Sequence, residues 1–192
     1  MANYGRDLEI GIPGNVVLED AHNEFAGEEF IVGAIETLKT TTIVSCPVLP
    51  IGIPGIGLTA EDASDAMGTL VNLRVPKRGV IVSATYFDLD DEGTQVDLEI
   101  FNHVITQVAD NATWTCSDAD IIYFLTEIAF VSFDDHTVSQ TSEVTNIGKA
   151  YTAPEGLLWI QAVCRVICTI AADSAPRFQL QIQSFDPDFK ES

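Results

Sequence analysis

The chain has 192 residues, of which 46% are hydrophobic, so it is long enough and apolar enough to fold around a core of its own. Its 9 Lys and Arg residues stand against 29 Asp and Glu residues, which gives a formal net charge of -20. A surface of this charge repels nucleic-acid phosphates and anionic lipid, so we predict neither nucleic acid nor membrane as a partner.

The N-terminal part of the chain carries one pentapeptide twice, IGIPG at residues 10–14 and 51–55. No apolar run typical of a secretory signal precedes the first copy. Residues 47–59 contain no charge, which in so acidic a chain predicts burial, either within the fold or against another subunit. We predict that residues 1–57 form an N-terminal arm or extra β-segment that contacts neighbouring subunits. Packing within its own domain and chance repetition of the pentapeptide remain alternatives.

A short helical turn is predicted at residues 59–68, TAEDASDAMG. Thr59 could cap it, acidic residues occupy its first turn, and Gly68 could end it. From residue 79 onward the dominant hydrophobic period is two, which is typical of strands. Strand-like runs separated by turn residues such as Gly, Asp, Asn and Pro occur at residues 79–87, 94–105, 118–133, 156–172 and 177–185. This pattern predicts an all-β domain over residues 58–192, most simply a jelly-roll-like β-sandwich.

The connection DLDDEG at residues 88–93 has the spacing of a calcium loop, because Asp88, Asp90, Glu92 and Glu99 fall at carboxylate positions and Gly93 at the turn position. An EF-hand loop lies between two helices, whereas both flanks here favour strands. We therefore predict a hairpin whose Gly93 sets the turn, whose carboxylates face water, and whose Glu99 lies on the outer face of a strand.

Neither catalysis nor a cofactor is indicated. The chain has no Gly-x-Ser-x-Gly elbow, no phosphate-binding glycine loop and no closely spaced histidines, so we predict no catalytic residue, no cofactor and no metal ligand. The cysteines form no CxxC pair, and we expect them to be small buried side chains in a reducing compartment; they are Cys46, Cys116, Cys164 and Cys168.

Two groups of residues are candidates for contact with another protein. The segment LRVPKRG at residues 73–79 holds three of the nine basic residues and could contact an acidic neighbour, although a solvated connection is the simpler interpretation. The uncharged segment supplies the apolar candidates. The predicted contact residues are Val48, Leu49, Ile51, Ile53, Ile56, Leu58, Arg74, Lys77 and Arg78.

The order of several short motifs resembles a loose group of tailed-bacteriophage virion proteins. These motifs are an AEDAxxAMGTL-like segment, a strand ending in Asp-x-Asp, a DLEIF strand, a DNA…SDAD loop and a late LWIQAV strand. They lie at residues 60–70, at Asp88 and Asp90, and at residues 97–101, 110–120 and 158–163. The resemblance spans residues 58–183 and leaves out the first fifty residues.

This resemblance implies a jelly-roll-like capsid decoration, or cement, protein without catalytic residues. The partners that it implies are the major capsid protein and sister copies in a homotrimer. We would then expect synthesis in the bacterial cytoplasm and a place on the capsid exterior. The alternative is a tail, baseplate or head-fibre module that recognises a host glycan or receptor, for which Trp114 is the best exposed aromatic candidate.

Overall fold

The computed structural model describes residues 8–11, 15–18, 42–51, 62–168, 175–186 and 189. Contacts divide the chain into two units, Met1–Thr41 and Thr42–Ser192. In the first unit, β1 (Leu8–Gly11) and β2 (Asn15–Leu18) pair as antiparallel strands. The predicted boundary between residues 57 and 58 lies outside the described residues, as does most of both IGIPG copies.

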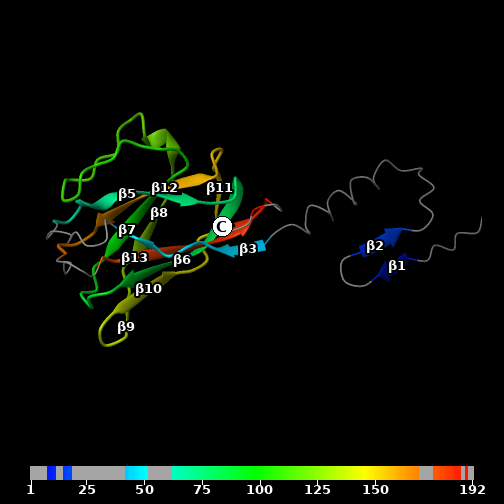
Figure 1. Cartoon of the computed structure of the whole chain (residues 1–192), viewed down its shortest axis with the longest axis horizontal. Helices are drawn as coiled ribbons and strands as arrows, with labels where there is room; N and C mark the ends of the chain where they lie inside the picture. The colour runs from blue at the N-terminus through cyan, green and yellow to red at the C-terminus, as the bar shows by residue number, and fades with distance from the viewer. Residues whose placement is uncertain are drawn as a thin grey trace, which may run out of the picture. The chain divides into compact units, whose positions relative to one another are not determined.

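The second unit consists of two antiparallel sheets packed together, as Figure 1 shows. One sheet has the order β3-β13-β6-β10-β9, with β4 beside β13 and β11 beside β6. Its strands are β3 (Thr42–Ser45), β4 (Leu49–Pro50), β6 (Arg78–Asp88), β9 (Asp134–Asp135), β10 (Gln140–Val144), β11 (Lys149–Thr152) and β13 (Arg177–Ser184). The other sheet has the order β5-β12-β7-β8, with strands β5 (Ala66–Arg74), β7 (Val96–Phe101), β8 (Phe124–Phe130) and β12 (Leu157–Cys164).

The pairing of these strands is nested along the chain. β3 pairs with β13, β5 with β12, β6 with β10, and β7 with β8, so early strands pair with late ones around a central hairpin. A long hairpin rolled up in this way is the jelly roll, which places successive strand pairs in alternate sheets. The prediction of an all-β, jelly-roll-like sandwich is therefore confirmed.

The core lies between the two sheets and follows the alternation of the sequence. In β13 the side chains of Phe178, Leu180 and Ile182 are buried, while the glutamines between them lie on the other face. The ring of Tyr86 in β6 stacks on Phe130 in β8 with 5.5 Å between centroids, which joins the two sheets through aromatic packing.

The predicted helical turn at residues 59–68 is wrong in its described part. β5 begins at Ala66, opposite Val163, and the side chains of Ala66 and Met67 are buried. Gly68 takes a positive φ of 66°, and its N–H donates to Asp110 Oδ1 at 2.6 Å. Burial of two apolar side chains against β12 therefore outweighs the local capping pattern, since helix propensity is a weak preference.

Candidate functional site

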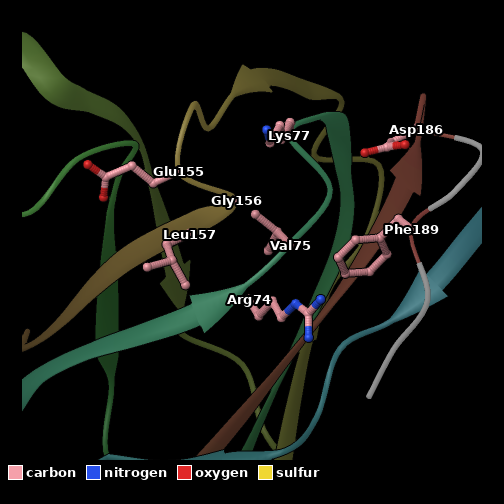
Figure 2. A pocket seen from close by; sticks show the side chains of 8 residues that line it. All are labelled: Arg74, Val75, Lys77, Glu155, Gly156, Leu157, Asp186 and Phe189. Carbon is pink, nitrogen blue, oxygen red and sulfur yellow. The ribbon is translucent and has the colours of Figure 1, made fainter.

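A pocket of about 390 Å³ opens at the end of the sandwich where β5 ends and β6 and β12 begin. Figure 2 shows Asp186 and Phe189 on one side of it and Glu155 on the other. Hydrogen bonds from Val75 N–H to Gly156 O, at 2.9 Å, and from Ala153 N–H to Lys77 O, at 2.8 Å, fix its backbone. The lining residues are Arg74, Val75, Lys77, Glu155, Gly156, Leu157, Asp186 and Phe189.

The three predicted basic contact residues all lie at this end of the sandwich, which we call the pocket end. Arg74 is the last residue of β5, Lys77 lies in the connection, and Arg78 begins β6. All three are exposed, and Arg74 and Lys77 line the pocket together with the carboxylates Glu155 and Asp186. The pocket end thus offers a partner surface both positively charged hydrogen-bond donors and negatively charged hydrogen-bond acceptors.

The predicted apolar contact residues lie elsewhere. Val48 is exposed, Leu49 is half-buried in β4, and Ile51 is only 1% exposed and packs in the core of its own unit. Burial of Ile51 matches packing within its own domain, so its side chain is closed to a partner in the folded subunit. β4 pairs with the start of β13, where Arg177 lies opposite Phe87. Phe87 is near the end of β6, whereas Arg78 begins that strand at the pocket end. β4 therefore lies toward the opposite end of the sandwich from the basic residues. Ile53, Ile56 and Leu58 lie outside the described residues.

An exposed apolar patch adjoins the pocket end. It consists of Val104, Ile121, Ile122 and Phe124, with exposed fractions between 37% and 73%. Its two segments touch, because Asn102 N–H donates to Tyr123 O at 3.0 Å and the His103 ring stacks on Tyr123. Asn102 Nδ2 also donates to Thr152 O at 3.1 Å, and His103 Nε2 lies 3.9 Å from Glu155 Oε1, so the patch borders the loop that lines the pocket.

The sequence interpretation missed this patch because it treated residues 118–133 as one continuous strand. The structure places a 3-10 turn, η1 (Ile121–Tyr123), before β8, which begins only at Phe124. Ile121 and Ile122 therefore lie outside the sheet, and their side chains are exposed. The signal was present in the run Ile-Ile-Tyr-Phe, which lacks the alternation of a half-buried strand.

No protein-family model and no curated protein matches this chain. Among the residues that the structure describes, no helix is long and apolar enough to cross a bilayer. In the same part of the chain, no three His, Cys, Asp or Glu side chains gather in a way that could hold a metal ion.

The acidic connection is not a hairpin, so that prediction is wrong. β6 pairs with β10, β11 and β13, whereas β7 pairs with β8 and β12, so residues 89–95 cross from one sheet to the other. The expectation that its carboxylates face water is wrong for Asp88, which is 2% exposed. Its Oδ2 accepts from Gly93 N–H at 2.7 Å and its Oδ1 from Asp90 N–H at 3.3 Å. Asp88 therefore caps the backbone of the connection, and Gly93 takes the left-handed φ of 64° that the turn requires.

Glu99 lies on the outer face of β7, as predicted, in a row of acidic side chains. It is half-buried and stands opposite Glu127 in β8, and Asp97, two residues earlier in β7, lies on the same face. The pKa of Glu99 is raised to about 7, chiefly by burial and also by the charges of Glu127 and Asp97. Arg165 forms ion pairs with Asp97 and, at 3.0 Å, with Glu127. Burial also raises the pKa of Asp97, although its hydrogen bond from Arg165 opposes the change.

The raised pKa of Glu99 predicts that stability falls as pH rises from about 4.5 to about 7. In this window the unfolded chain has already released the proton that folded Glu99 still holds, so rising pH favours unfolding. Glu99→Gln should remove this contribution and raise the free energy of unfolding at pH 8 by on the order of 1 kcal/mol, discounted for the exposed part of the side chain.

Urea unfolding of both proteins at pH 5 and pH 8 measures this effect. Glu143→Gln, at an exposed position of β10, is the matched control and should leave the pH dependence unchanged. If the free energy of unfolding changed between pH 5 and pH 8 by the same amount in Glu99→Gln as in the original protein, Glu99 would not be the source of the pH dependence.

Proposed function

We propose that this chain is a structural protein of a tailed-phage particle, a decoration protein that binds the outer surface of the head and stabilises the shell. The observation that carries the proposal is the composition of the pocket end. On a chain of net charge -20, it gathers three of the nine basic residues beside an exposed apolar patch. Apolar area supplies the adhesive free energy of a protein interface, and interspersed charges fix its register.

In the proposed mechanism the pocket end faces the shell. The apolar patch is buried against the major capsid protein, while Arg74, Lys77 and Arg78 meet acidic groups and Glu155 meets basic ones. A standard interface of about 1,600 Å² would hold one subunit. Because many copies bind one lattice, multivalent attachment adds avidity without further contacts in any single copy. The acidic remainder of the surface faces solvent and keeps particles apart.

Sister subunits are proposed to form a homotrimer through the outer face of the β3-β13-β6-β10 sheet. Along β13 this face presents three glutamines, Gln179, Gln181 and Gln183, and only one charge, at Arg177. Ile43 of β3, directly opposite Gln183, is 67% exposed. Exposed Glu143 of β10, in line with Thr85 and Gln179, adds one negative charge to this face. A face with so few charges limits direct repulsion between copies of a chain this acidic.

A module that recognises a host glycan or receptor is the alternative. A glycan-binding face commonly presents an open aromatic ring, but Trp114 is half-buried and packs edge-on against Phe101 with 6.4 Å between ring centroids. No specific contact favours this alternative over attachment to the shell.

Imaging the particle by electron cryo-microscopy tests the proposed function. Regular density over the head shell is the expected result. A few copies confined to the tail tip would contradict the proposal and would support the recognition module.

A further inference from the structure

Cys164 and Cys168 bring their sulfur atoms together where β12 ends. The distance between the two Sγ atoms is 2.8 Å, and both side chains are buried. This is well inside the roughly 3.5–4.0 Å of ordinary non-bonded contact between heavy atoms. It is within about 1 Å of the roughly 2.05 Å bond of a disulfide. We propose that Cys164 and Cys168 are a modification site at which a small-molecule disulfide oxidises the two thiols to an intrachain disulfide.

The backbone around Cys164 holds its thiol in place. Cys164 N–H donates to Asp65 O at 2.9 Å, Ser64 N–H donates to Cys164 O at 2.7 Å, and Arg165 N–H donates to Gln95 O at 2.9 Å. Cys168 lies at the other end of the turn and packs in the same core. Bond formation therefore needs a small movement of two side chains and no rearrangement of the sheet.

The turn between the two cysteines gives a reagent its route. Val166 and Ile167 are exposed, the second at 73%, although both sulfur atoms are covered. Local opening of an exposed turn needs far less free energy than global unfolding. We therefore expect a small disulfide to reach one thiol when this turn opens, without unfolding of the sandwich.

The chemistry is thiol–disulfide exchange with a low-molecular-weight disulfide such as oxidised glutathione. One cysteine thiolate attacks the small disulfide, forms a mixed disulfide and releases one small thiolate. The second cysteine thiolate then attacks the protein sulfur of that mixed disulfide and releases the second small thiolate. Two electrons pass to the small disulfide, and the two protons lost by the cysteines end on the released thiols.

The crosslink would fix the turn that carries Arg165. This side chain forms ion pairs with Asp97 of β7 and Glu127 of β8, so the turn connects β12 to two further strands of the sheet. A protein that is synthesised with reduced cysteines in a cytoplasm would gain stability when it later enters an oxidising medium and the disulfide forms. The proposal rests on the sulfur geometry alone and stands whether or not the chain decorates a phage head.

Peptide mapping of the full-length protein tests the disulfide. The protein is equilibrated with oxidised glutathione, denatured, alkylated and digested with trypsin, which cleaves at Arg165 between the two cysteines. We expect peptides 150–165 and 166–177 to remain linked before reduction and to separate after it. The intact mass should fall by about 2 Da, for two lost hydrogens. Alkylation of all four cysteines after the same treatment, or a linkage that involves Cys46 or Cys116, would overturn the proposal.

Melting temperatures provide a second readout. Oxidised protein should melt about 4 °C above reduced protein, because the crosslink restricts the unfolded chain. Cys168→Ser should remove this gap, whereas the control Cys116→Ser should keep it. If Cys168→Ser does not fold, the peptide map of the original protein still decides the outcome. A gap that persists in folded Cys168→Ser would contradict the assignment.

Discussion

Replacing Asp88 with Ala should lower the free energy of unfolding by about 2–3 kcal/mol and the melting temperature by about 4–12 °C. Both carboxylate oxygens of Asp88 accept backbone N–H groups of the connection between the sheets, and the side chain is buried. Alanine leaves these donors without their acceptors and opens a small void beside β10. Thermal unfolding followed by circular dichroism measures the change.

Two variants and a measurement with added calcium distinguish a capping role of Asp88 from a role as a calcium ligand. Asp88→Asn keeps one acceptor oxygen, so we expect about half of the loss. Glu92→Ala, an exposed position of the same connection, should change the free energy of unfolding by less than about 0.5 kcal/mol. Calcium should leave the melting temperature of the original protein unchanged. A rise with calcium that disappears in Asp88→Ala would contradict the capping role and support a metal site.

Replacing Ile122 with Asp should weaken binding to head shells at least about 30-fold while the protein stays folded. The side chain of Ile122 is 73% exposed in η1 and is the most exposed member of the apolar patch, so the sandwich does not depend on it. In the proposed interface the same position becomes buried, and a carboxylate there would lose its water without gaining a partner. Co-sedimentation with shells that lack the protein gives the apparent affinity.

Val138→Asp is the matched control for this experiment. Val138 is 75% exposed and precedes β10, whose Gln140 lies opposite Asp88 at the end of β6 away from the pocket. Both substitutions replace a highly exposed aliphatic side chain with a carboxylate, but the two positions lie at opposite ends of the sandwich. Shells that bind both variants equally well would show that the apolar patch is not the contact surface.

The inward and outward faces of β7 and β13 could be predicted from the sequence because buried and less buried side chains alternate along these strands. In β7 the alternation of Val96, Leu98 and Ile100 with Asp97 and Glu99 places the first set in the core and the second outside. The connection at residues 75–77, with its proline, places the predicted basic residues at an end of the sandwich.

Strand partners could not be predicted in the same way. A short polar connection can join two paired strands or cross between sheets, and residues 89–95 do the second. The choice depends on how whole strands are buried against partners that are distant in sequence. A local sequence pattern carries no information about those distant partners. The approach of Cys164 and Cys168 likewise depends on how the chain turns after β12. The apolar patch also depends on where β8 begins, at Phe124, which the sequence pattern of residues 118–133 does not indicate.

A cryo-microscopy map of the intact particle, at a resolution that orients the sandwich, would show directly whether the pocket end contacts the head shell. We expect copies in groups of three across the head, with the pocket end against the shell and the β13 glutamines toward sister subunits. Density found only at the tail, or subunits on the head whose pocket end faces solvent, would contradict this expectation.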